Sequence, residues 1–249
     1  ESGSVGIRPG PYMASTNRFE ISLIGKGGHI SKPESCIDPV RMATDFMSSL
    51  YPALEKQLEP DKYIIGVGRI QGGAQFNRIP DTVEILGSYR TFDRETTDII
   101  DRTIKGCLKE VVKRYAKPGE EFSGFPDYEL DILHGYPVLV NDPVFTDAVH
   151  LNLQENFPEL TIYPEIEKTF AAEDFASYLQ KVPGVFISLG TRNPEKKILE
   201  VNHSCTFDID EDILITGTEI FYIVSLDFLK TPEKYLNSQS YFSSEPLRK

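Results

Sequence analysis

Residues 17–30, NRFEISLIGKGGHI, contain the pattern that decides the fold of the first half of the chain. Phe19, Ile21 and Leu23 alternate with polar residues, and strict alternation is typical of a half-buried β-strand. The glycine-rich run that ends at His29 then predicts a turn. The sequence therefore begins this region with a strand and a tight reversal.

Further elements follow at regular spacing. Asp38-Pro39 predicts a helix start, with an aspartate cap and a proline at the first helical position, while Pro52 is expected to kink or shorten this helix. Two strands, a second helix beginning at Asp93 and a fourth strand are expected over residues 63–70, 83–92, 93–117 and 128–133. Residues 17–134 thus have the order β-α-β-β-α-β of the ferredoxin-like arrangement, an α+β superfold that names no function by itself.

The second half has a different pattern. It predicts a helix over 142–156, a strand over 160–164, a helix from 171–175 to about Lys181, a buried strand over 185–189 and a last helix over 211–229. The last helix is apolar around its circumference, so it is expected to be buried on all sides. The preceding residues provide too little material to cover it. This half is therefore expected to be part of a larger α/β layer structure.

Composition excludes some classes of function. The 249 residues have a formal net charge of −12, which argues against a nucleic-acid partner. Thr218 and Glu219 interrupt the longest apolar run, so no membrane span is expected. Three dispersed cysteines favour a reducing, cytoplasmic compartment over a disulfide framework.

Val201 to Glu211 contains the strongest candidate for a metal ligand, His203, followed by Phe207 and several acids. Catalytic metal sites need three or more protein ligands, and no paired-histidine motif occurs in this chain. A loop histidine near acids can equally be a surface or capping residue. His29 in its turn is either a polar group presented to a neighbour or an ordinary turn residue.

Four other residues have both a functional and a bland interpretation. Glu173 and Asp174 lie at a predicted helix start, where acids in the first turn interact favourably with the helix dipole, so helix capping is their simplest interpretation. Asn77 is unremarkable in a turn, but an amide can donate to a developing oxyanion. Arg90 is usual on a solvated edge strand, but a guanidinium can bind a carboxylate through two parallel bonds.

The order of several short motifs resembles the aminoacylase and hippurate-hydrolase type of metallopeptidase, which includes N-acyl amino acid amidohydrolases and auxin-conjugate hydrolases. The resemblance extends from about residue 3 to residue 229. The motifs are Arg8-Pro9-Gly10, the GKGGH turn, Asp38-Pro39, GGAQFNRIPD, SYRTF, Gly135-Tyr136-Pro137, AAEDF, Val182-Pro183-Gly184 and the His203 segment.

The resemblance implies a catalytic domain interrupted by a ferredoxin-like lid that dimerises. Residues 1–14 would end a first catalytic segment, 15–134 would form the lid, and 135–230 would continue the catalytic domain. The composition of residues 231–249 predicts a polar tail that is peripheral or mobile. By the same resemblance, the small substrate is an N-acyl amino acid and the protein is a homodimer.

The resemblance also implies roles for the candidate residues. His203 would bind a divalent metal, Zn or Mn, and His29 would reach into the partner subunit's site to stabilise the tetrahedral intermediate. Asn77 would assist that histidine. Arg90 would orient the substrate carboxylate, and Glu173 and Asp174 would line the cleft.

One departure is large: the family's other metal ligands and its general-base glutamate lie N-terminal to the Arg8-Pro9-Gly10 stretch. The reaction implied for the full protein is attack of a metal-activated water on an amide carbon. The chain alone is expected to be the C-terminal part of such an enzyme and inactive. The alternatives are a non-catalytic dimerisation or binding module, and a carboxypeptidase or dipeptidase of the same superfamily.

Overall fold

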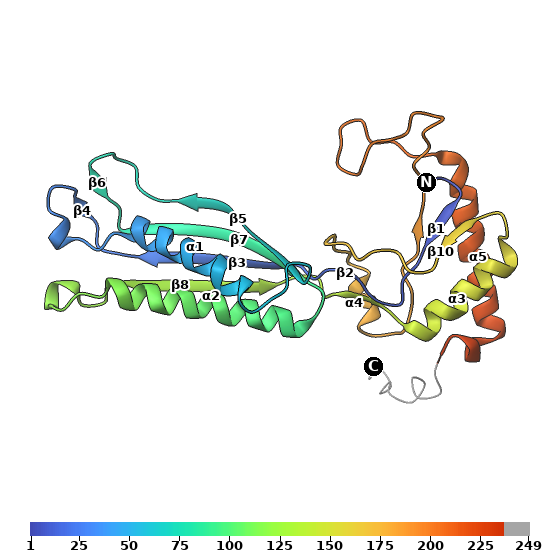
Figure 1. The fold of residues 1–249 in the computed structure, drawn as a ribbon, viewed down its shortest axis with the longest axis horizontal. Helices are drawn as coiled ribbons and strands as arrows, with labels where there is room; N and C mark the ends of the chain where they lie inside the picture. The colour runs from blue at the N-terminus through green and yellow to red at the C-terminus, as the bar shows by residue number, and fades with distance from the viewer. Residues whose placement is uncertain (237–249) are drawn as a thin grey trace, which may run out of the picture. The chain divides into compact units, whose positions relative to one another are not determined.

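The computed structural model describes residues 1–236, which form two compact units. The central unit comprises Ala14–Val138 and Phe170–Ala172. The terminal unit comprises Glu1–Met13, Leu139–Thr169 and the residues from Glu173 onward. Figure 1 labels the elements of both units. Residues 237–249, most of the expected polar tail, lie outside the described part of the chain.

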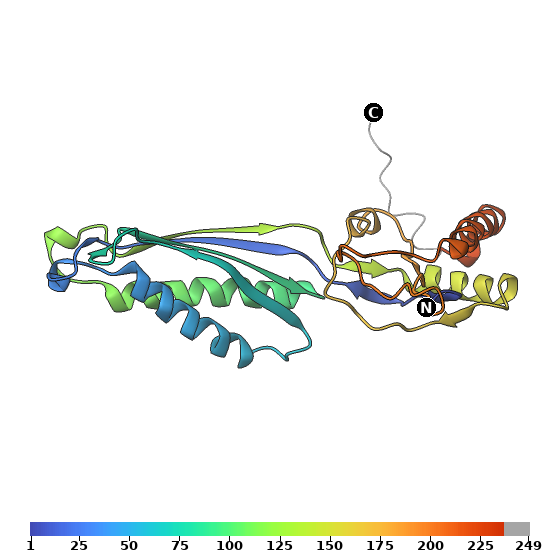
Figure 2. The same cartoon turned by 90° about the horizontal axis from the view of Figure 1, so that it is seen from above.

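The central unit contains one four-stranded antiparallel sheet in the order β5-β7-β3-β8. In chain order, helix α1 follows strand β3 and helix α2 follows strand β7. The sheet strands and these helices therefore have the sequence order β-α-β-β-α-β. Figure 2 shows both helices on the same side of the sheet. The elements are β3 (Asn17–Ile24), α1 (Pro39–Glu55), β5 (Tyr63–Gln71), β7 (Thr82–Thr91), α2 (Arg94–Tyr115) and β8 (Asp127–His134).

The helix starts are fixed by the caps that the sequence predicts. The Asp38 carboxylate accepts a hydrogen bond from Val40 N at 2.8 Å, and Asp93 accepts one from Thr96 N at 2.7 Å. The expectation for Pro52 is corrected in part: α1 contains Pro52 and still continues to Glu55, so the proline does not shorten it.

Side chains from the sheet and both helices form the core of the central unit. A Cβ on Gly87 would lie 2.1 Å from Cζ of Phe19, so only glycine allows the Phe19 ring to cross β7. The alternating apolar residues of β3 are all buried, which is the basis of the predicted strand. The core residues are Phe19, Ile21, Leu23, Ile37, Met42, Ala43, Phe46, Leu50, Leu54, Val83, Ile85, Tyr89, Ile100, Ile104, Leu108, Val111 and Phe122.

Two short strands, β4 (Gly28–His29) and β6 (Arg78–Ile79), pair with each other outside this sheet. Two single-turn 3-10 helices, η1 (Pro33–Ser35) and η2 (Glu120–Phe122), lie in the neighbouring connections. The sequence patterns did not predict these four elements.

The terminal unit is built from smaller pieces. Its sheet has the order β10-β1-β11, with β1 parallel to β10 and antiparallel to β11, and β2 pairs separately with β9. The strands are β1 (Ser4–Gly6), β2 (Gly10–Met13), β9 (Leu139–Asn141), β10 (Thr161–Tyr163) and β11 (Ser188–Leu189). The helices are α3 (Pro143–Asn156), α4 (Ala176–Leu179), η3 (Glu211–Ile213), α5 (Leu214–Lys230) and η4 (Pro232–Lys234).

Three expectations for this half are corrected. The helix expected to reach about Lys181 is the four-residue α4, and β11 is only two residues long. In α5 Ile220 is the one buried residue, while Ile215 and Phe221 are 68% and 74% exposed, so the helix is not buried on all sides. The tail is not wholly peripheral, because Tyr235 is fully buried between Phe145 and Phe228.

Over the described residues, none of the helices has the length and apolar character needed to cross a membrane.

Candidate functional site

The pairing of β4 with β6 brings two of the predicted site residues together. His29 is opposite Arg78 in this pair, and the backbone N–H of Ile30 donates to the carbonyl oxygen of Asn77 at 3.1 Å. His29 is exposed and Asn77 is half-buried. The two residues are far apart in sequence, yet this ladder holds their backbones side by side.

The His29 ring has a defined hydrogen-bonding arrangement. The backbone N–H of Ser31 donates to Nδ1 at 3.2 Å, and Ser31 Oγ lies 2.8 Å from the same nitrogen. Because a backbone N–H can only donate, Nδ1 is an acceptor, and the neutral ring has its proton on Nε2. The free edge of the ring therefore presents an N–H donor.

The loop that carries His29 is fixed at its base and from outside. Lys26 and Ile37 exchange two backbone hydrogen bonds of 2.9 Å. The ammonium of Lys117 donates to the carbonyl oxygens of Cys36 at 2.7 Å and Glu34 at 3.1 Å. It also lies 5.1 Å from the centroid of the Phe122 ring. The loop is thus held to the segment that follows α2.

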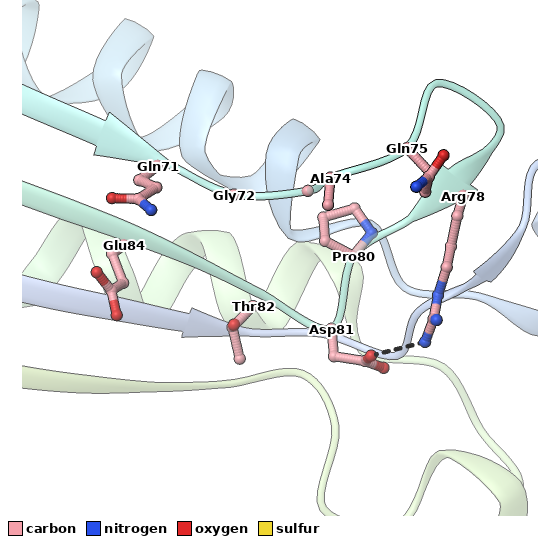
Figure 3. A pocket seen from close by; sticks show the side chains of 10 residues that line it. Gln71, Gly72, Ala74, Gln75, Arg78, Pro80, Asp81, Thr82 and Glu84 are labelled. Atoms are coloured by element: carbon pink, nitrogen blue, oxygen red, sulfur yellow. Dashed lines mark hydrogen bonds and ion pairs between the residues drawn. The ribbon is translucent and has the colours of Figure 1, made fainter.

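A polar recess of about 490 Å³ lies under the connection between β5 and β6. Figure 3 shows Gln71, Glu84 and the ion pair between Arg78 and Asp81 around it, and the pair measures 3.4 Å. Neither His29 nor Asn77 lines this recess. The charges of Arg78 and Asp81 in its wall are paired with each other. Because neither candidate residue lines the recess, it is not the place where they meet.

Arg90 lies in β7, an inner strand opposite Ile64 of β5, so the solvated-edge interpretation is wrong. Its neighbours Tyr89 and Thr91 are buried against the helices, whereas Arg90 is half-buried on the other face. Its side chain makes no ion pair or hydrogen bond with any described residue.

Arg90 is remote from His29 and Asn77 within one copy of the chain. β7 begins at Thr82, shortly after β6, and Arg90 is eight residues further along the strand. At about 3.3 Å per residue, this separation is roughly 25 Å. One amino-acid-sized ligand cannot contact both ends of β7.

Glu173 and Asp174 immediately precede α4, but neither side chain caps it. The N-cap residue of α4 is Phe175, without a side-chain cap bond. Glu173 Oε1 instead accepts from the backbone N–H of Asp174 at 3.1 Å. Asp174 is exposed, and the next residues, Phe175 and Tyr178, stack with ring centroids 5.9 Å apart. The capping interpretation is therefore wrong for this pair.

His203 lies in an exposed turn with a backbone φ of 69°. Such left-handed geometry is uncommon for a residue with a side chain and marks the turn as a possible functional segment. Within the described residues, no hydrogen bond or ion pair joins His203 to Glu173 or Asp174.

The acid cluster after His203 has a structural role. Asp210 is 2% exposed and accepts hydrogen bonds from Asn193 Nδ2 at 2.6 Å and Lys196 Nζ at 2.5 Å. The hydrogen bonds from Asn193 and Lys196 hold the pKa of Asp210 well below its usual value. The same contacts, with Asp212, raise the pKa of Lys196. Asp210 thus fixes the loop before η3.

Residues 1–236 contain no group of three or more His, Cys, Asp or Glu side chains able to hold a metal ion. His203 is the candidate ligand within this range, and its surroundings provide no second one. The described residues by themselves therefore do not fit a metal centre.

Sequence patterns missed the residues that position His29. Ser31 and Lys117 have no local signal, since Lys117 contacts carbonyl oxygens more than 80 residues earlier. The sequence patterns also gave no signal for the contacts of His134, which lies 2.7 Å from Asn17 Oδ1 through Nδ1 and 3.3 Å from Asp101 Oδ2 through Nε2. Asp101 also accepts a hydrogen bond from the Tyr89 hydroxyl. Burial is the larger cause, and this hydrogen bond the second, of a raised pKa for Tyr89.

Comparison with known proteins identifies relatives. Thermostable carboxypeptidase 2 of Saccharolobus solfataricus is 32% identical over 91% of this chain and 55% of its own length. N-acetylcysteine deacetylase of Bacillus subtilis is 30% identical over 92% of this chain and 56% of its length. IAA-amino acid hydrolase ILR1-like 4 of Arabidopsis thaliana is 28% identical over 91% of this chain and 50% of its length.

Solved structures give the same result. A putative aminohydrolase from methicillin resistant Staphylococcus aureus matches with a TM-score of 0.83 and 30% identity, over 92% of this chain and 56% of the other. A dinuclear metal binding peptidase of the M20 family from Bacillus subtilis matches with a TM-score of 0.72 and 26% identity, over 92% and 54%.

The chain spans about half the length of the curated relatives it matches. The resemblance to hydrolases of the aminoacylase type is confirmed by these relatives. Because the family model for peptidases M20/M25/M40 matches residues 1–226, nearly the whole described chain, the protein belongs to this family of hydrolases.

Proposed function

We propose that this chain contributes to hydrolysis of the amide bond of N-acyl amino acids. Support comes from relatives named for that chemistry, an N-acetylcysteine deacetylase and an IAA-amino acid hydrolase. The observation that carries the proposal is the β4–β6 pair, in which His29 lies opposite Arg78 and the backbone N–H of Ile30 donates to the carbonyl oxygen of Asn77. It holds the Nε2–H donor of His29 within one register position of the Asn77 backbone.

His29 and Asn77 suit the stabilisation of negative charge that develops on a carbonyl oxygen. The Ser31 N–H fixes His29 as an Nε2–H donor, and a preorganised donor is worth most where the oxyanion forms. We assign the role of a second donor to the amide of Asn77, whose backbone lies on the neighbouring strand. Arg90, with no partner among the described residues, is suited to bind the substrate carboxylate through two parallel hydrogen bonds.

The substrate-binding Arg90 and the catalytic His29 act on one ligand only if they come from two copies. Their separation of roughly 25 Å along β7 supports a homodimer in which His29 acts across the interface. We assign residues 15–134 to a ferredoxin-like lid that forms this dimer, residues 1–14 and 135–230 to the catalytic domain, and 231–249 to a tail.

The two edges of the central sheet differ in a way that favours β5 as the dimer edge. β8 has three acids along its length, Asp127, Glu129 and Asp131, and charged residues protect an edge from pairing. β5 instead exposes Ile64 and Ile70. Its backbone groups on the outer side are available to a second strand.

In this proposal His203 is one ligand of a divalent metal, Zn or Mn, in the complete enzyme. The outlying φ of His203 and the dinuclear metal binding relative support the assignment. The described residues provide no further ligands, so no catalytic step is derived through the metal. Glu173 and Asp174 are assigned to the wall of the substrate cleft.

The isolated chain is accordingly expected to be inactive. Purified chain incubated with N-acetylcysteine or N-acetylmethionine and either Zn²⁺ or Mn²⁺ should release no free amino acid. Turnover that depends on the added metal would show that the chain is a sufficient enzyme and would overturn this part of the proposal.

A chimaera tests the substrate class. The chain would be joined to the part of Bacillus subtilis N-acetylcysteine deacetylase that it does not match. We expect hydrolysis of N-acetyl amino acids that is lost in His203→Ala and strongly reduced in His29→Ala. Activity unaffected by both substitutions would refute the assigned roles, and circular dichroism of each variant controls for folding.

A carboxypeptidase activity is the second candidate. It is favoured by thermostable carboxypeptidase 2 of Saccharolobus solfataricus, which is 32% identical to the chain. The same chimaera distinguishes the two activities when given a peptide with a free C-terminus and an N-acetyl amino acid at equal concentration. A higher kcat/KM for the peptide would select the carboxypeptidase.

A further inference from the structure

The Phe76 side chain is 94% exposed, the highest value for a large apolar side chain among the described residues. It lies directly before Asn77, and the two residues form the turn that leads into β6. A single exposed apolar residue is ordinary by itself, so what matters is how the loop holds Phe76 and what surface could receive it.

The segment around Phe76 is held on both sides. At one end, Gln71 of β5 pairs with Glu84 of β7. At the other end, the carbonyl oxygen of Asn77 accepts a hydrogen bond from Ile30 N at 3.1 Å. Gly73 between them has a φ of 76°, a conformation that only glycine adopts easily. The exposure of Phe76 is therefore built into the loop.

The ring of Phe76 is not packed into the recess beneath its own loop. The polar groups of this recess include Gln71, Gln75, Glu84 and the Arg78–Asp81 pair, and Phe76 is not among its lining residues (Figure 3). Burying an aromatic ring against these groups would desolvate them without new hydrogen bonds. The ring of Phe76 is therefore exposed and available to a partner.

The terminal unit offers a matching surface next to another candidate site segment. Tyr178 and Val182, which follow Glu173 and Asp174, are 66% and 58% exposed. Tyr178 stacks on Phe175, with 5.9 Å between the ring centroids. We define residues 173–182 as the aromatic segment. Aromatic side chains that meet in this way are frequent anchors of protein interfaces.

We propose that Phe76 is an anchor of the contact between two copies of this chain, packing on the aromatic segment of the second copy. The inference rests on the proposed function, in which Asn77 of one copy and Glu173–Asp174 of the other serve the same cleft. Phe76 is adjacent to Asn77, and Tyr178 lies four residues after Asp174, in α4. If the first pair converges, the second pair is brought into contact.

Site-specific photocross-linking tests the contact on the full chain without any need for activity. p-Benzoylphenylalanine replaces Phe76 in one preparation, which is mixed with ¹⁵N-labelled wild-type chain before irradiation. Mass spectrometry then separates links between copies from links within one copy. We expect links from position 76 to residues 173–182 of the second copy.

Phe221 on α5 provides a matched control, since it is also a phenylalanine and is 74% exposed. The photoreactive residue at 221 should form no links to residues 173–182 of a second copy. Links from position 76 that stay within the copy, or that reach only the second copy's central unit, would overturn the proposal.

The dimer dissociation constant provides an independent measurement. Phe76→Ala should raise it about tenfold, a loss of about 1.4 kcal/mol, and should leave the thermal unfolding midpoint of the monomer unchanged because the ring is exposed. Phe221→Ala should change the dissociation constant less than twofold.

The outcomes separate the two levels of the proposal. A wild-type chain that stays monomeric at all concentrations would overturn the dimer and this contact together. A stable dimer whose Phe76→Ala variant associates normally would overturn the contact alone.

Discussion

The imidazole Nδ1 of His29 accepts a hydrogen bond from the backbone N–H of Ser31 at 3.2 Å. The two residues are separated by two positions, so the interaction is local to the loop. It sets which nitrogen of the ring can donate outward.

The first prediction concerns this tautomer. Ser31→Pro removes the N–H donor, whereas Ser31→Ala retains it. A net hydrogen-bond contribution of about 0.5–1.5 kcal/mol predicts a rise of about 2- to 10-fold in the Nδ1–H tautomer of Ser31→Pro. Long-range ¹H–¹⁵N correlation spectra at about pH 9, where histidine rings are neutral, provide the measurement. A Nδ1–H population as large in Ser31→Ala as in Ser31→Pro would contradict the assignment.

The second prediction concerns Lys117, which binds two carbonyl oxygens of the His29 loop. Lys117→Met should lower the free energy of unfolding by about 1–2 kcal/mol and speed amide exchange over residues 30–37. Hydrogen exchange with mass spectrometry gives the local effect. Lys113→Met, one turn earlier on α2, is the control and should leave exchange in this loop unchanged. Equal amide exchange over residues 30–37 in both variants would show that the Lys117 hydrogen bonds do not stabilise the loop.

The third prediction separates strain from folding at His203. Its φ of 69° favours glycine, so His203→Gly should be more stable than His203→Ala by about 1 kcal/mol. Urea unfolding of the three proteins gives the comparison. This result would mean that the fold does not need a histidine here. If His203→Gly is instead the least stable of the three, the imidazole itself holds the turn.

The fourth prediction is a dependence on pH. The pKa of Asp210 is lowered in the folded protein, so its stabilising effect is complete above the ordinary aspartate value of 3.8 and is lost as the pH falls below that value. As the pH is lowered, the urea midpoint of Asp210→Asn should therefore fall less steeply than that of the wild type. Asp208→Asn, at an exposed position, should show the same dependence of the urea midpoint on pH as the wild type. Midpoints of urea unfolding between about pH 2 and pH 6 measure the effect, and an equally steep fall for wild type and Asp210→Asn would count against it.

Much of the central unit could be predicted because its patterns are local. Alternation at Phe19, Ile21 and Leu23, and the caps at Asp38 and Asp93, specify strands and helices within a few residues. The small β4–β6 pair was missed because two-residue strands have no period. Yet this pair is what joins His29 to Asn77.

The terminal unit was harder to predict for a related reason. Its strands have two to four residues, and β1 pairs with β10 across more than 150 positions. The composition of α5 predicted burial on all sides, but burial depends on which neighbours are present, and the described residues cover one face only. The capping prediction at Glu173 failed because α4 begins at Ala176 with Phe175 as its N-cap, and the Glu173 carboxylate accepts from Asp174 N instead.

The distance between the two ends of β7 has a genetic consequence. Suppose that a site needs Arg90 from one copy and His29 from the other. A His29→Ala allele and an Arg90→Ala allele are then each defective alone. In a mixed dimer, however, one site regains both residues while the second site loses both. The two alleles would complement each other in one cell, as defects in the same residue never can.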